Sequence, residues 1–142
     1  MREYQKIPTP SGLPLHHLGP PLEEGPLPTL FYFALSGRES LTLDPYNQPI
    51  QFFEGKKVRA FSLTLPHHSD GLPPNESIAA WGREMGAGRD PLAPFLKQAG
   101  EAIRFALEQG WIDLDRLAHL PLHPAQLERI RDATHDQNPV VK

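Results

Sequence analysis

Two apolar stretches decide the fold: Thr29-Leu-Phe-Tyr-Phe-Ala-Leu-Ser36 and Val58-Arg-Ala-Phe-Ser-Leu-Thr-Leu65. Both are rich in the aromatic and β-branched residues that favour strands. The connection between them is long enough for a crossover helix, whereas antiparallel neighbours need only a tight turn. The two stretches therefore predict parallel neighbouring strands in a βαβ unit of an α/β fold.

The pattern inside each stretch predicts which faces are buried. Residues Leu30–Leu35 are apolar at nearly every position, which is typical of a strand covered on both faces. In the second stretch Phe61, Leu63 and Leu65 lie on one face, and Ala60, Ser62 and Thr64 lie on the other. Between the strands, Pro49 suits a first helical position and Gly55 a helix stop, so we expect a short helix there.

The remaining elements follow from helical periodicity and turn signals. The strongest helix prediction is Asp90–Gln109, with Asp90 as its N-cap. One apolar stripe runs along it: Leu92, Phe95, Leu96, Ala99, Ile103, Ala106 and Leu107. A shorter helix is expected over Glu76–Met85 with Asn75 as cap, and a third parallel strand over Arg116–Leu120.

The N-terminal segment predicts either a hairpin or an unstructured arm. Ser11-Gly12 is a turn signal between Tyr4–Thr9 and Leu13–Leu18, and a short hairpin there would sit at a sheet edge. Adjacent residues of a strand point to opposite faces, so His16 and His17 are poor joint ligands for one metal ion. We interpret them as ordinary polar residues of a loop or edge.

Composition excludes several classes of partner and chemistry. The 142 residues include 17 prolines and carry a net charge of −3, without the basic stripe that nucleic acids require. The absence of cysteine excludes disulfides, thiolate zinc sites and a cysteine nucleophile. No apolar run has the length of a membrane span, and the N-terminus lacks the apolar core of a signal peptide. We expect a cytoplasmic protein without a cofactor.

Two strand-end loops hold the candidate site residues. Ser36 and Gly37 follow the first strand at its carboxyl end, where open α/β sheets bind ligands, although the pair could simply make a turn. His67, His68 and Asp70 follow the second strand and could form a metal or acid–base cluster. A zinc site needs three or four ligands and a supporting shell, so a solvated loop is the preferred interpretation and no metal site is predicted.

The order of several motifs resembles the first half of an α/β-hydrolase. Phe31-Tyr-Phe-Ala-Leu-Ser-Gly37 is followed by Arg59-Ala-Phe-Ser-Leu-Thr-Leu-Pro-His-His68, a long helix, and Trp111-Ile-Asp-Leu-Asp-Arg-Leu-Ala118. The chain is most similar to dienelactone-hydrolase-like and prolyl-oligopeptidase-like esterases, from Tyr4 to Ala118. The resemblance implies an incomplete three-layer domain over residues 1–120, with a short, mostly parallel sheet and flanking helices. It also implies an oxyanion-loop N–H at Ser36 or Gly37 and a small acyl or ester ligand.

The sequence departs from that family after Ala118. The nucleophile elbow, Gly-x-Ser-x-Gly, occurs nowhere; Ser36 is flanked by Ala34 and Arg38 in place of the glycines, and no serine follows Ser77. We therefore assign no catalytic residue. Residues 121–142 are interpreted as a divergent tail, a weak helix and then disorder, from a truncated or frame-shifted gene product, or alternatively as the native ending of a small module.

Three functions remain open from the sequence. The first is a serine-hydrolase fragment that is inactive alone because an oxyanion hole without a nucleophile forms no acyl-enzyme. The second is a non-catalytic binding or interaction module that uses loops 36–40 and 66–71. The third, which ranks below the other two, is metal-dependent hydrolysis by His67, His68 and Asp70. A sheet that stops near the missing elbow would also expose a strand edge, which predicts self-association.

Overall fold

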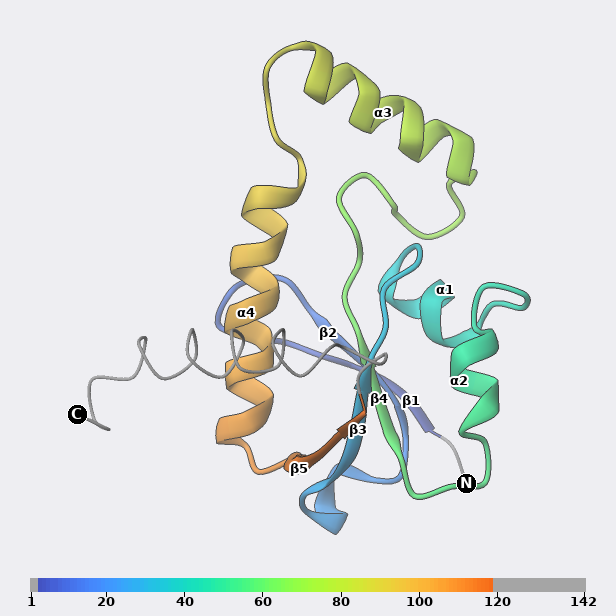
Figure 1. Ribbon diagram of the computed structural model, residues 1–142, viewed down its shortest axis with the longest axis vertical. Coiled ribbons are helices and arrows are strands. Elements are labelled where there is room, and N and C mark those ends of the chain that lie inside the picture. The colour runs from blue at the N-terminus through green and yellow to red at the C-terminus, as the bar shows by residue number, and fades with distance from the viewer. Residues whose placement is uncertain (1–2, 119–142) are drawn as a thin grey trace, which may run out of the picture.

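The core of the structure, a computed structural model that describes residues 3–118, is a mixed five-stranded sheet with helices on both faces (Figure 1). The strands are β1 (Glu3–Ile7), β2 (Leu15–Gly19), β3 (Leu27–Phe31), β4 (Arg59–Ser62) and β5 (Ile112–Ala118), in the spatial order β1-β2-β4-β3-β5. The helices are η1 (Leu22–Glu24, 3-10), α1 (Gly37–Thr42), α2 (Gln48–Phe52), α3 (Pro74–Gly86) and α4 (Leu92–Glu108). The predicted α/β class is confirmed; the predicted tail, residues 121–142, lies outside the described residues.

The strand β3 is parallel to both of its neighbours. Leu30 faces Ala60 of β4 on one side and Ala118 of β5 on the other. The βαβ unit predicted from the two apolar stretches is therefore confirmed. The N-terminal segment forms the hairpin rather than an arm: β1 and β2 pair antiparallel, and Gly12 makes the turn with a φ of 82°. The strand β2 also pairs antiparallel with β4.

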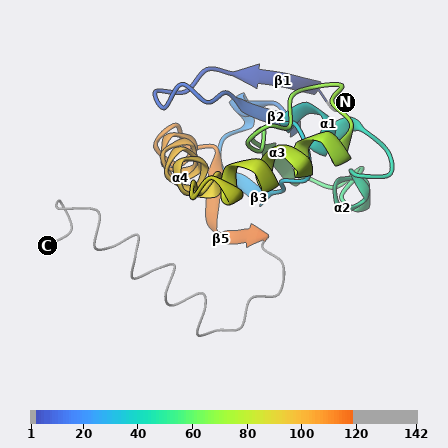
Figure 2. The same ribbon diagram turned by 90° about the horizontal axis from the view of Figure 1, so that it is seen from above.

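Each face of the sheet has its own apolar layer. Seen from above, α4 lies on one side of the sheet and α1 and α2 on the other (Figure 2). The layer under α4 contains Leu15, Phe61, Leu63, Phe95, Ala99, Ala102, Ala106 and Ile112. The layer under α1 and α2 contains Leu30, Leu41, Ile50 and Ala60. The predicted alternation along β4, with Phe61 and Leu63 opposite Ala60, is thus confirmed and gives the three-layer arrangement.

Several boundaries differ from the predicted ones. The strand β3 ends at Phe31 rather than Ser36, and β5 begins at Ile112 rather than Arg116. The helix α3 begins at Pro74, so Asn75 lies inside it and does not cap it. Asp90 does cap α4, since its Oδ1 accepts the N–H groups of Leu92 at 2.9 Å and Ala93 at 3.3 Å. Among the described helices, none combines the length and hydropathy that crossing a bilayer requires.

A fully buried arginine ties two connections to the start of β4 through three backbone carbonyls. The guanidinium of Arg59 donates to the carbonyls of Pro21 at 2.7 Å and Gly25 at 2.8 Å, and also to that of Trp111. Burial lowers the pKa of Arg59, and the negative charges of Glu24 and Glu23 act in the opposite direction. Since a buried charge needs hydrogen-bond partners, these carbonyls stabilise the ion and hold the chain around η1 against the entry to β5.

Both histidines of β2 are buried, so the interpretation of His16 and His17 as polar loop or edge residues is wrong. The reason is that β2 lies between β1 and β4, inside the sheet. The ring of His17 packs against Phe61 with 5.3 Å between centroids. Burial, and secondly the charge of Arg59, lowers the pKa of His17 from 6.5 to about 4.

This burial predicts a stability that falls in mild acid. Between pH 6.5 and about 4 the unfolded chain protonates His17 and the folded chain does not, so acid favours unfolding. The stability is complete above pH 6.5 and falls as the pH is lowered, and below pH 4 the free energy of unfolding is lower by about 3 kcal/mol. Urea unfolding at several pH values measures it. H17L should flatten the dependence over this range, while H67Q, at an exposed position, should not; equal curves for wild type and H17L would contradict the assignment.

Candidate functional site

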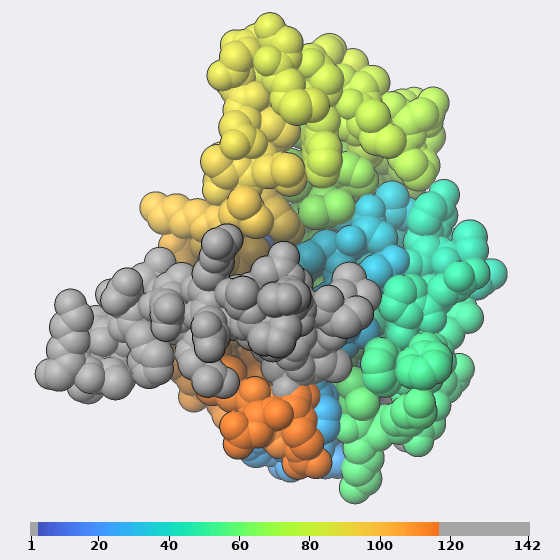
Figure 3. Space-filling view, viewed as in Figure 1, coloured from blue at the N-terminus to red at the C-terminus, as the bar shows by residue number. Residues whose placement is uncertain are grey.

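The candidate residues gather at the carboxyl ends of the parallel strands. Because β3 and β4 run in the same direction, the loops that leave them emerge at the same edge of the sheet. Figure 1 shows both loops at that end, between the sheet and α3. In the space-filling view, α3 and the segment that connects it to α4 form this end of the molecule (Figure 3). The loops predicted separately from the sequence are therefore neighbours in space.

Two serines build the loop after β3. Ser36 is the N-cap of α1, and its Oγ accepts the N–H of Glu39 at 3.0 Å. The Oγ of Ser40 accepts the N–H groups of Ala34 and Leu35, both at 3.0 Å, and donates to the Ser36 carbonyl at 2.7 Å. These bonds end the strand and begin α1, a helix that the sequence analysis treated as loop.

Gly37 lies so close to His16 that any larger residue would displace the imidazole ring. A Cβ at this position would lie 2.1 Å from Cδ2 of His16, whose Nδ1 is 2.7 Å from the hydroxyl oxygen of Tyr4. The N–H of Gly37 donates to Oγ1 of Thr64, on the segment after β4, at 2.9 Å. A substrate oxyanion at this N–H would therefore have to replace Thr64 as its acceptor.

Glu39 joins the two loops. Its Oε1 accepts the Ser36 hydroxyl at 3.1 Å and the N–H of Gly71 at 3.1 Å. The sequence analysis missed this residue, although Ser36-x-x-Glu39 has the spacing of a capping box and could have identified the start of α1. Its carboxylate here reaches across to loop 66–71 and fixes the two loops relative to each other.

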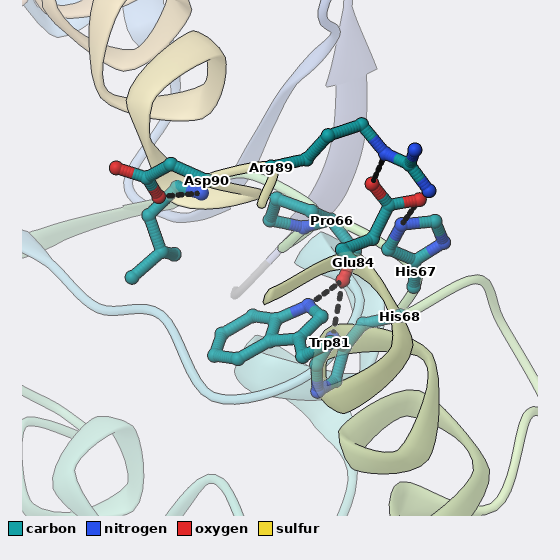
Figure 4. Close-up of polar contacts among 8 residues, drawn as sticks. Pro66, His67, His68, Trp81, Glu84, Arg89 and Asp90 are labelled. Atoms are coloured by element: carbon teal, nitrogen blue, oxygen red, sulfur yellow. Dashed lines mark hydrogen bonds and ion pairs between the residues drawn. The ribbon is translucent and has the colours of Figure 1, made fainter. Parts of the chain in front are cut away.

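His68 is buried and holds the second loop in place. Its Nδ1 donates to the carbonyl of Pro66 at 2.7 Å, and Nε1 of Trp81 on α3 donates to the same carbonyl at 2.6 Å (Figure 4). The rings of His68 and Trp81 meet edge to face with 5.1 Å between centroids. His68 therefore connects the start of loop 66–71 to α3.

His67 and Asp70 do not form a cluster with His68, although the three residues are close in the sequence. His67 has a left-handed backbone with φ at 61°, and its Nε2 lies 3.8 Å from Oε1 of Glu84 on α3 (Figure 4). The same carboxylate is hydrogen-bonded by Arg89, which is the main reason that the pKa of Glu84 is lowered. Asp70 is exposed, and its charge acts on both Tyr4 and His16. Within residues 3–118, no three His, Cys, Asp or Glu side chains are placed to hold a metal ion.

The hydroxyl–imidazole pair found at this edge is Tyr4 with His16. Burial raises the pKa of Tyr4 and lowers that of His16, so both groups stay neutral near neutral pH. Among the described residues, no hydrogen bond connects Asp70 to His16, so no hydroxyl–imidazole–carboxylate chain forms. The imidazole of His16 packs against Gly37, and Tyr4 is hydrogen-bonded to that imidazole, so the pair has a packing role.

Comparisons with known proteins concern the fold alone. No protein-family model and no curated protein matches the chain. A solved structure named m3DLH matches with a TM-score of 0.49 and 17% identity, over 82% of this chain and 47% of the other. A PEG-bound complex of a novel cold-adapted esterase from an Arctic intertidal metagenomic library matches with a TM-score of 0.47 and 16% identity, over 77% of this chain and 45% of the other. The chain spans about half the length of both, and we transfer no residue role from them.

The contact between Gly37 and His16 predicts opposite effects of two glycine substitutions. G37A should lower the free energy of unfolding by about 1–3 kcal/mol, because the new methyl group overlaps the imidazole ring. G100A is the matched control: Gly100 lies in α4 with open space at its Cβ, so alanine should raise stability by about 0.5–1 kcal/mol. Urea unfolding measures both. Adding H16A to G37A should recover part of the loss, and a G37A protein as stable as G100A would refute the contact.

Proposed function

We propose that residues 3–118 form the oxyanion-loop side of an α/β-hydrolase-like serine hydrolase for carboxyl-ester or acyl substrates. One observation carries the proposal: β3 lies between two parallel strands and leads through Ser36 and Gly37 into α1. In α/β-hydrolases the loop between the third strand and the first helix supplies an oxyanion-hole N–H. The sequence motifs that resemble this family fall on the same strands and loops.

The second part of the proposal is that this chain alone does not turn esters over. The 142 residues contain no Gly-x-Ser-x-Gly. The hydroxyl of Ser36 donates to Glu39, and that of Ser40 donates to the Ser36 carbonyl, so within residues 3–118 neither is hydrogen-bonded to the imidazole base of a Ser–His pair. Hydrogen-bond donors can stabilise a developing oxyanion, but without a nucleophile and base there is no covalent step to accelerate.

The proposal predicts no serine-hydrolase activity in the isolated chain. Hydrolysis of p-nitrophenyl acetate and butyrate should equal that of the heat-denatured protein, and a fluorophosphonate probe should add no mass to the intact chain. An active serine esterase, run in parallel, controls for both reagents. The S36A variant should behave like wild type, because the Ser36 hydroxyl caps a helix. Stoichiometric labelling of any serine, or turnover that survives purification, would refute the proposal.

A second candidate is a non-catalytic binding or interaction module that uses loops 36–40 and 66–71. The observation that favours it is the bridge from Glu39 to both Ser36 and Gly71, which makes the two loops one surface. Rigid loops at the carboxyl edge of a parallel sheet are a common place for ligands, whatever the chemistry. Saturable binding of a ligand that is neither an ester nor an acyl compound separates this candidate from the first, because the first assigns carboxyl-ester or acyl substrates to the same loops.

A further inference from the structure

Loop 66–72 and α3 border an open cleft of about 290 Å³. Its lining residues are His67, Ser69, Leu72, Glu76, Ala80 and Arg83. The loop wall is fixed at both ends: the Pro66 carbonyl accepts the Trp81 N–H, and the Gly71 N–H donates to Glu39. His67 adopts a left-handed backbone, which is uncommon outside glycine and concentrates at functional sites. The loop side of the cleft is therefore tied to both α3 and α1.

Two opposite charges stand on the helix wall of this cleft. Glu76 and Arg83 are seven residues apart on α3, which places them on one face, about 10 Å apart along the helix axis. Among the described residues, no ion pair joins these two side chains. Neither side chain makes a hydrogen bond or ion pair with any other residue in the range 3–118, and the neighbouring Glu84 is already engaged by Arg89 and His67. The helix wall therefore offers a negative and a positive group; the charge of Arg83 also acts on Glu84, which Arg89 already hydrogen-bonds.

The rest of the lining suits the middle of a ligand. Ala80 lies between the two charges on α3, and Leu72 faces the cleft from the loop. His67 and Ser69 add side chains that can donate or accept hydrogen bonds. Since most small-molecule sites combine apolar walls with a few polar groups, this arrangement favours an extended molecule with charged ends.

We propose that the cleft binds a small dipolar molecule whose carboxylate contacts Arg83 and whose ammonium contacts Glu76. The charges of the ligand are about 10 Å apart, which is the length of an extended tripeptide with free termini. This inference rests on the binding-module candidate and names its ligand class. It does not require the hydrolase proposal, and its readout involves no turnover.

Triglycine, followed by the backbone amide signals of the full chain in NMR titrations, is the direct probe. Its addition should shift the amides of Ser69 and Ala80, with weak affinity because exposed ion pairs contribute little. Triglycine amide lacks the carboxylate and N-acetyl-triglycine lacks the ammonium, so each should bind about two- to fivefold more weakly. Diglycine is too short to reach both charges and should also bind more weakly, and added salt should reduce the differences.

Variants that remove one charge identify which side chain contacts the carboxylate of the peptide and which contacts its ammonium. R83Q should abolish the difference between triglycine and its amide but keep the difference from the N-acetyl form, and E76Q should do the reverse. K97Q and E101Q, on exposed positions of α4, are matched controls and should leave both differences intact. Equal binding of free and capped peptides, or unchanged differences in R83Q and E76Q, would overturn the inference. Shifts confined to residues 36–40 would keep the binding module and overturn this site.

Discussion

The structure depends on one constraint, the parallel pairing of β3 with β4 on one side and β5 on the other. Parallel neighbours end at the same edge of a sheet, so the chain must turn there after each strand. At that edge the N–H of Gly37 donates to the hydroxyl of Thr64, and the carboxylate of Glu39 accepts the N–H of Gly71. Hydrogen bonds between segments far apart in the sequence thus hold the two loops together. The second of these loops also forms one wall of the cleft beside α3.

The parts of the fold that sequence could predict are those with local causes. The apolar stretches, the alternation around Phe61, the turn at Gly12 and the cap at Asp90 all act over a few residues, and all four are confirmed. The helix α1 was missed because it is too short to show a periodic stripe. The burial of His17 was missed because it depends on which strands flank β2, and neither neighbour is specified by the histidine itself.

The candidate site also contains features that local sequence cannot predict. His67 and His68 are adjacent in sequence, yet the left-handed backbone at His67 lets one side chain face Glu84 while the other is buried against Trp81. Conversely, Glu39 and Arg59 resemble ordinary surface charges in the sequence. Each instead connects segments that meet only in the folded chain. The capping-box spacing could have identified the contact of Glu39 with Ser36, but nothing local specifies its bond to Gly71 or the bonds of Arg59 to distant carbonyls.

The functional account starts from this geometry, a frame with two strand-end loops joined through Glu39; that no serine attacks a carbonyl is our proposal. Its central claim, that β3 lies between β4 and β5 with all three parallel, is tested most directly by backbone nuclear Overhauser effects in the isotope-labelled full chain. The account predicts contacts from Leu30 to Ala60, and from Leu27 to Ile112, in the parallel pattern. Contacts from β5 to a strand other than β3, or an antiparallel pattern between β3 and β4, would contradict it.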